Sequence, residues 1–252
     1  MHMLRQTLVI PIVLLFSMAW FGCAGSNVTD KDKARAFEDI GTSAVRQGKL
    51  RSALENYLQA EKFDPENAYV KDELAQVYRD LGQYQKALQY FKEAIALKPR
   101  FPEAQNNLGA LYLLLKEYDL AIEYCQKAAD DLLYKTPHFA YTNLGLAYFF
   151  KGKHEMAVQS FQQALKLAPE YSPAYFGLGY VYEKLKFWNG AIEAYKKSIF
   201  YAPENADAYF RVGKLYKQMN RTLEAQEALR HFLELVPKGP DAEEAKRLLR
   251  TM

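Results

Sequence analysis

Few residues of this 252-residue chain combine the types and spacing that catalysis or metal binding needs. The four histidines show no H-E-x-x-H or other metal-ligand spacing, and no G-x-S-x-G motif is present. Gly48-Lys49 and Gly152-Lys153 could begin a phosphate-binding loop, but neither lysine is followed by Ser or Thr. Cys125 has no suitable partner, which favours a buried, inert thiol. The sequence therefore predicts a protein without enzymatic activity, cofactor or metal ion.

The composition excludes other classes of function. Lys and Arg number 33 against 30 Asp and Glu, and the resulting net charge of +3 is too small to indicate a nucleic-acid partner. Half of the residues are hydrophobic and 25% are charged, which excludes wholesale disorder. Two cysteines cannot form a disulfide framework.

The N-terminus has the pattern of an export signal. A short start that contains Arg5 precedes an uncharged apolar run from Leu8 to Phe21, and small residues follow it. A membrane-spanning helix needs about 20 apolar residues, whereas the rest of this uncharged stretch is rich in Gly, Ser, Asn and Thr. The pattern therefore predicts a signal peptide.

The segment Trp-Phe-Gly-Cys that ends at Cys23 resembles the lipobox of bacterial lipoproteins, with Trp20 in place of the usual Leu. The resemblance implies that residues 1–22 are removed and that Cys23 is the lipid-attachment residue, carrying acyl chains such as palmitate. Ala24 implies sorting to the outer membrane of a Gram-negative bacterium, where the protein would face the periplasm. Residues 23–33 would be the lipidated cysteine and a tether. The alternatives are an uncleaved membrane anchor and simple secretion.

Most of the chain is one unit repeated six times. A shift of 34 residues aligns Gly, Ala, Tyr and Pro positions along the sequence, and only the third unit is longer, with 36 residues. The units are 34–67, 68–101, 102–137, 138–171, 172–205 and 206–239.

Small residues recur at two positions of the unit. The eighth residue is Gly or Ala, and the twentieth is Ala in all six units. Small side chains at these positions let two antiparallel helices approach closely, while larger apolar residues at the seventh, eleventh and twenty-fourth positions fill the remaining space. Proline ends the second helix in five units, because it lacks an N–H and fixes φ.

This pattern resembles the tetratricopeptide repeat (TPR). The resemblance implies an all-α fold, a right-handed superhelical solenoid of six TPR helix pairs. Residues 240–252 are expected to form a capping helix at its C-terminal end. In the longer third unit, residues 130–135 are expected to extend the second helix and to change the superhelical angle. Thr136 and Pro137 then supply the N-cap and the first-turn proline of the next helix.

In stacked helix pairs the first helix of each unit lines an extended concave face. Helical spacing and the resemblance to peptide-binding TPR proteins place the second, fifth, sixth, ninth, twelfth and thirteenth positions there. In the middle units these positions carry apolar, aromatic and amide side chains, and an apolar stripe that faces water marks a binding site. The predicted peptide- or protein-binding residues are Asn107, Leu113, Asn143, Leu146, Phe149, Phe150, Phe176, Tyr180 and Arg211.

The predicted binding residues are expected to contact a ligand through hydrogen bonds, apolar packing or charge. The side-chain amides of Asn107 and Asn143 can donate to and accept from the backbone of an extended peptide, or they are ordinary solvated residues. Phe149 and Phe150 bind the ligand, or they pack under residues 130–137. Basic residues toward the C-terminal end favour acidic ligand residues. The predicted apolar anchors are Leu146, Phe149, Phe176 and Tyr180.

A lipoprotein signal, a short tether and six TPR units together resemble the type IV pilus pilotins. That family consists of outer-membrane lipoproteins that help secretin subunits reach the outer membrane and assemble. The resemblance implies that Cys23 docks the chain on the membrane while the solenoid holds a segment of a secretin subunit. The runner-up is a TPR lipoprotein scaffold for exopolysaccharide export or for peptidoglycan machinery. An enzyme accessory or glycan-processing domain is disfavoured because catalytic groups are missing.

Overall fold

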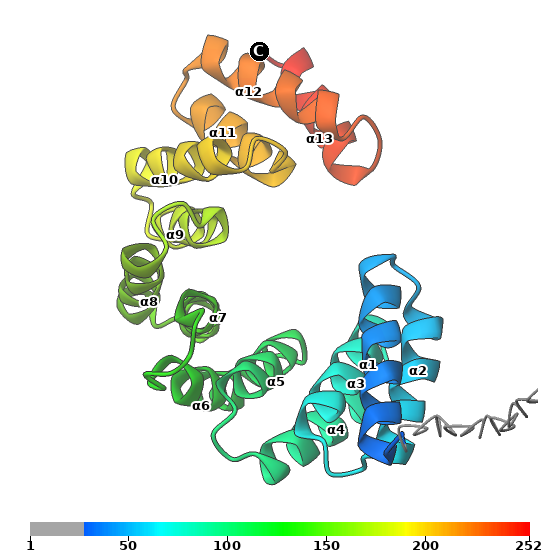
Figure 1. Cartoon of the computed structure of the whole chain (residues 1–252). Helices are drawn as coiled ribbons and strands as arrows, with labels where there is room; N and C mark the ends of the chain where they lie inside the picture. The colour runs from blue at the N-terminus through cyan, green and yellow to red at the C-terminus, as the bar shows by residue number, and fades with distance from the viewer. Residues whose placement is uncertain (1–27) are drawn as a thin grey trace, which may run out of the picture.

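The chain folds into helices joined by short turns. The computed structural model describes residues 28–252, and this part of the chain contains thirteen α-helices and no strands. Each predicted repeat unit contributes two consecutive helices, and one more helix follows the sixth unit (Figure 1). The helices are α1 (Asp30–Arg46), α2 (Leu50–Phe63), α3 (Ala68–Asp80), α4 (Tyr84–Leu97), α5 (Pro102–Leu114), α6 (Tyr118–Ala129), α7 (Pro137–Phe150), α8 (His154–Leu167), α9 (Ser172–Lys184), α10 (Trp188–Tyr201), α11 (Ala206–Gln218), α12 (Thr222–Leu235) and α13 (Pro240–Arg250).

The turn inside each unit contains one residue with a left-handed backbone, at the fifteenth repeat position. All six residues there have φ between 57° and 74°. Gly48 and Gly152 adopt this conformation without steric cost because they lack Cβ, whereas Lys186 and Asn220 carry side chains into it. The two Gly-Lys pairs therefore lie in turns between paired helices, which agrees with their rejection as phosphate-binding loops.

The core of each unit forms where its two helices cross. The alanines at the twentieth position are completely buried in all six units. At the twenty-fourth position Tyr57, Phe161 and Tyr195 are also fully buried and lie against the glycine of the facing helix. A Cβ on Gly179 would lie only 2.4 Å from the Tyr195 ring, so the ring requires glycine there. Cys125 takes this position in the third unit and is fully buried, and burial raises its pKa to about 12.

The helix pairs stack side by side into a curved solenoid. Figure 1 shows an open ring in which α5 and α7 lie on the inner side and α6 and α8 on the outer side. Each unit packs mainly against its sequence neighbours, as expected for a repeat architecture. The result is an all-helical solenoid with a concave inner face.

The connection between α6 and α7 differs from the sequence prediction. Residues 130–136 form turns instead of extending α6, because contacts outside the segment hold them. The Asp131 carboxylate accepts two hydrogen bonds from Arg100, at 2.7 and 3.1 Å, and a third from the Leu133 N–H at 2.8 Å. Tyr134 is buried beside Cys125. At this junction α6 packs against α7 more extensively than the second helix of any other unit packs against the first helix of the next unit.

The two ends of the solenoid are finished differently. At the C-terminal end, the predicted capping helix forms as α13, whose Ala242 and Ala245 cover Phe210 and Phe232. At the other end no helix within residues 28–252 covers α1. Ile40, at the seventh repeat position, is 51% exposed, whereas the equivalent residues of the other units are at most 6% exposed.

Of the predicted N-terminal features, the structure describes only the last part of the tether. The signal peptide 1–22 and Cys23 lie outside the described residues. The predicted tether is shorter than expected, because α1 already begins at Asp30. Thr29 starts it with a capping box, in which its hydroxyl accepts from the Asp32 N–H and the Asp32 carboxylate accepts from the Thr29 N–H. Within residues 28–252, no helix has the length and apolar character that crossing a membrane requires.

Candidate protein-binding face

The predicted binding residues lie on α5, α7, α9 and α11, and six of the nine belong to two chemically different regions. The first, called the aromatic region here, consists of Phe149, Phe176, Tyr180 and Arg211. The second, called the amide region, consists of Asp72, Asn106, Asn107 and Asn143. Sequence reasoning assigns all four residues of the amide region to concave-face positions, but it misses that Asp72 and Asn106 are the hydrogen-bond partners of Asn107 and Asn143.

Tyr180 of α9 is the centre of the aromatic region. Its ring centroid lies 5.8 Å from that of Phe149 on α7 and 5.3 Å from that of Phe176 one turn earlier on α9, both edge to face. All three side chains are half-buried. Edge-to-face pairs of this kind add to the stabilisation that burial provides. The structure therefore brings three of the four predicted anchors into one cluster.

Arg211 of α11 fixes this cluster to the next unit. Its guanidinium lies over the Tyr180 ring, 3.7 Å from the centroid, and also donates to the Tyr180 hydroxyl. Glu183 accepts from Arg211 at 3.0 Å and from the Tyr195 hydroxyl at 2.8 Å, both on the same carboxylate oxygen. Burial and the Glu183 charge raise the pKa of Tyr195, which keeps this hydroxyl a donor.

A hollow of about 430 Å³ opens beside the cluster, between Phe149, Tyr180 and the turn after α9. Lys184, Lys186 and Arg211 line it against a single carboxylate, that of Glu183, so the hollow favours an anionic ligand group. Trp188 also lines it. Sequence reasoning misses Trp188 because it starts the second helix of its unit, and only first-helix positions are counted toward the concave face.

The amide region links the first helices of neighbouring units through side chains. The Asn107 amide donates to both carboxylate oxygens of Asp72, at 3.3 and 3.4 Å. The Asn143 amide donates to the Asn106 side-chain oxygen at 2.9 Å. The two asparagines are thus more than solvated surface residues, and each already uses one of its amide hydrogens within the protein.

Asp72 makes the amide region sensitive to protonation. Its side chain is only 5% exposed, and burial raises its pKa to about 7, with a further contribution from the neighbouring Glu73 charge. The Asn107 hydrogen bond acts in the opposite direction. A hollow of about 770 Å³ adjoins this region and is lined by Tyr69, Phe139 and residues 134–136 of the connection before α7.

The remaining predicted residues, Leu113, Leu146 and Phe150, lie outside both regions. Leu113 and Leu146 are half-buried and pack on the adjacent cores. Phe150 is 55% exposed and stacks on Tyr118, with ring centroids 5.4 Å apart. Phe149 and Phe150 make their ring contacts with each other and with Tyr118, Tyr180 and His154, not with residues 130–137.

The sequence matches the tetratricopeptide-repeat family over residues 73–132, 138–171 and 206–238. Together these segments make up half of the chain, and the structure repeats the same helix pair throughout residues 34–239. The chain therefore belongs to the tetratricopeptide-repeat proteins. That fold is typically a non-enzymatic scaffold for protein binding.

Several solved structures share this architecture. PilW, described as a widely conserved type IV pilus biogenesis factor, has a TM-score of 0.78 at 23% identity, over 84% of this chain and 98% of PilW. PilF of Pseudomonas aeruginosa has a TM-score of 0.75 at 21% identity, over 86% of this chain and 98% of PilF. A MamA structure is 27% identical with a TM-score of 0.56, over 67% of this chain and 98% of MamA. The sequence matches no curated protein.

Proposed function

We propose that this TPR protein is an outer-membrane lipoprotein that acts as a pilotin in type IV pilus biogenesis. In this proposal Cys23 carries the lipid anchor, and the concave face holds a segment of a secretin subunit while secretins assemble. The lipoprotein-like N-terminus supports the anchor. The likeness in fold to PilW, which is described as a type IV pilus biogenesis factor, supports the role in pilus biogenesis.

The observation that carries the proposal is the aromatic region. Phe149, Phe176 and Tyr180 expose apolar ring surface on the inner face, and the hollow beside them carries three cationic side chains against one carboxylate. Such a surface suits a peptide segment that combines an apolar side chain with acidic ones. Arg211 holds the cluster in place, which lowers the entropic cost of binding.

The first experiment is crosslinking in native membranes, followed by purification through a C-terminal tag and mass spectrometry. A secretin subunit should be recovered with the wild-type chain and lost with a Phe149→Ala/Tyr180→Ala double variant. Secretin multimers should decline in the same variant while secretin protein remains at its normal level. The matched control is Leu223→Gln, which changes an exposed apolar side chain elsewhere on the solenoid.

Two outcomes would contradict the proposal. Recovery of polysaccharide-export or cell-wall proteins without a secretin would assign the scaffold to another envelope machine. Wild-type secretin recovery by the double variant would move the binding site away from the aromatic region. The anchor is tested separately: Cys23→Ser should abolish lipid labelling, and a Cys23→Ser protein that stays membrane-bound would indicate an uncleaved anchor.

A further inference from the structure

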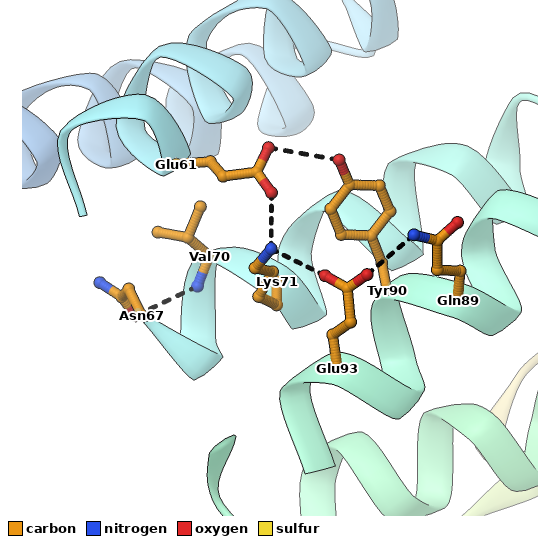
Figure 2. Close-up of polar contacts among 7 residues, drawn as sticks. All are labelled: Glu61, Asn67, Val70, Lys71, Gln89, Tyr90 and Glu93. Atoms are coloured by element: carbon orange, nitrogen blue, oxygen red, sulfur yellow. Dashed lines mark hydrogen bonds and ion pairs between the residues drawn. The ribbon is translucent and has the colours of Figure 1, made fainter. Parts of the chain in front are cut away.

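The outer side of the solenoid has a seam between the second helices of successive units, where the first helix of the following unit lies between them. Between the first and second units this seam is closed by polar contacts (Figure 2). Lys71 of α3 forms ion pairs with Glu61 of α2 and Glu93 of α4, both at 2.7 Å. The Tyr90 hydroxyl donates to Glu61, and the Gln89 amide donates to Glu93.

An aromatic side chain also fills the closed seam. Tyr90, at the twenty-third repeat position, stacks on Tyr78 at the eleventh, with ring centroids 5.4 Å apart. In the third unit Tyr124 stacks on Tyr112 in the same way, at 5.6 Å. These pairs occupy the space between the first helix and the second helix at the surface.

From the fourth unit onward the twenty-third position is small, and hollows are present at the seams before the fourth and the sixth units. Ser160 at this position of the fourth unit leaves a hollow of about 270 Å³ whose walls include Gln126, Gln159 and Gln163. In the sixth unit Ala228 takes the position, and the hollow reaches about 570 Å³. The two hollows share eight lining positions of the repeat. Lys196, Glu227 and His231 of the larger hollow take the places of Gln126, Gln159 and Gln163, and Ile199 and Phe200 are added to its apolar lining.

The hollow between the fifth and sixth units is called the outer groove here. Ile199 and Phe200 of α10 and Tyr209, Val212 and Tyr216 of α11 supply its apolar lining. At the positions that carry Glu61 and Lys71 in the closed seam, the outer groove has Ile199 and Tyr209, so no ion pair crosses it within the described chain.

Phe200 is the residue that sets this groove apart. It occupies the twenty-ninth repeat position and is 72% exposed, although a side chain of this size gains about 2–3 kcal/mol from burial. The other five units carry small or charged residues there: Lys62, Ala96, Asp130, Lys166 and Glu234. Folding of the repeat therefore does not require an aromatic residue at this position.

The two walls of the outer groove carry opposite charges. Lys196 stands on the α10 wall, and Glu227 stands on the α12 wall. Neither forms an ion pair within residues 28–252, whereas Arg221 and Glu224 at one end neutralise each other at 2.7 Å. A bound segment can therefore satisfy Lys196 with an acidic side chain and Glu227 with a basic one.

We propose that the outer groove is a second docking site, separate from the concave face, for an amphipathic segment of a partner protein. The segment places apolar side chains against Phe200, Ile199 and Tyr209, an acidic residue against Lys196 and a basic residue against Glu227. The solenoid thereby holds two protein segments at once, one on each face.

The test is photo-crosslinking in cells that produce the full chain with p-benzoylphenylalanine at position 200. The expected result is a crosslink to one partner protein, in a segment that carries apolar residues flanked by an acidic and a basic residue. The same probe at position 223 is the matched control, because Leu223 is 79% exposed on the sixth unit but does not line the groove. It should give no such product.

Two variants connect the crosslink to the groove, and the first installs a residue that two other units already carry at the same repeat position. With the probe retained at position 200, Ala228→Tyr fills the groove as Tyr90 fills the closed seam, and it should abolish the crosslink. Lys196→Glu should reduce it strongly, and a charge reversal in the acidic residue of the partner segment should restore it. Circular dichroism should show unchanged helix content and thermal midpoint for Lys196→Glu.

Other outcomes would overturn the proposal. These are a crosslink to lipid or to a second copy of this chain, equal products from positions 200 and 223, no product at position 200, or a product that persists in a folded Ala228→Tyr protein. Because the Phe149→Ala/Tyr180→Ala variant leaves the outer groove intact, loss of secretin binding at the concave face would not affect this result.

Discussion

The first two units and the last two units use the same repeat positions in opposite ways. In the first two, Lys71 joins Glu61 and Glu93 across the outer seam, so polar side chains satisfy one another within the protein. In the last two, Ile199 and Tyr209 leave the seam open beside an exposed Phe200. The buried positions that build the helix pair are alike in both. The difference shows that the buried repeat positions determine the fold, while the variable surface positions decide which surfaces stay available to partners.

The largest expected effect comes from the twenty-fourth repeat position, which carries a tyrosine in both the first and the fifth unit. Tyr57 and Tyr195 are fully buried, and each donates its hydroxyl to a glutamate. Truncation of either to Ala should lower the free energy of unfolding by about 3–5 kcal/mol through the cavity that it leaves. Because units contact mainly their neighbours, Tyr57→Ala should unravel the terminal unit alone, whereas Tyr195→Ala should also loosen the units on both sides. Hydrogen exchange resolved by segment measures this, and equal loosening by both variants would contradict it.

Protonation of Asp72 should stabilise the N-terminal half specifically. The folded pKa of about 7 lies above the unfolded value near 3.8, so the folded state binds the proton more tightly. This contribution is fully present below about pH 4 and is lost as the pH rises through 7, at most about 4 kcal/mol in total. Asp72→Asn should remove that dependence and unfold at higher denaturant concentration than wild type at pH 8. Chemical denaturation between pH 4 and pH 8 measures it, and an unchanged pH profile in the variant would refute it.

Removing the cation of the closed seam should lower the free energy of unfolding more than removing the cation of the outer groove does. Lys71→Met leaves Glu61 and Glu93 without their shared cation, and the expected loss is about 1–3 kcal/mol. Lys196→Met removes a cation that has no ion-pair partner among residues 28–252, so its effect should stay within about 0.5 kcal/mol. Urea denaturation of the two variants compares them directly. A similar loss in both would mean that the seam network adds nothing to stability.

The smallest effect concerns the left-handed turn residue. Lys186 holds φ at 60° where the first, second and fourth units have glycine. Lys186→Gly should therefore stabilise the protein by about 0.5–1 kcal/mol, while Gly48→Lys should destabilise it by about 1 kcal/mol. Thermal melting measures both. A Lys186→Gly protein that melts below wild type would show that the lysine side chain makes a compensating contact.

The sequence predicts the helix pairs because their determinants are local and periodic. Small residues at two fixed positions and an aromatic residue facing them specify each crossing, and six repetitions make the pattern plain. The turn at residues 130–136 could not be predicted in this way. Its own residues contain no helix breaker, and Arg100, which holds Asp131, lies a full unit earlier in the chain.

The sequence predicts which residues of the candidate site share a face, but it does not predict which of them are already hydrogen-bonded within the protein. Helical spacing predicts that Phe149, Phe176 and Tyr180 share one face, and in the structure their rings lie against one another. Spacing along one helix cannot reveal that Asn107 is engaged by Asp72 on a neighbouring helix. The outer groove exists because Ala228 lacks the aromatic ring that Tyr90 carries at the same repeat position. Only a comparison of the two units shows this.

The unequal ends of the solenoid have a consequence for extending it. Among residues 28–252, α13 covers the last repeat unit, whereas no helix covers the outer side of α1. A unit added before α1 would bury Ile40, which is already exposed at the position that packs against a preceding unit elsewhere. A unit added after α13 would have to displace Ala242 and Ala245 from Phe210 and Phe232. Within residues 28–252, the repeat surface is therefore covered at the C-terminal end and exposed at the N-terminal end.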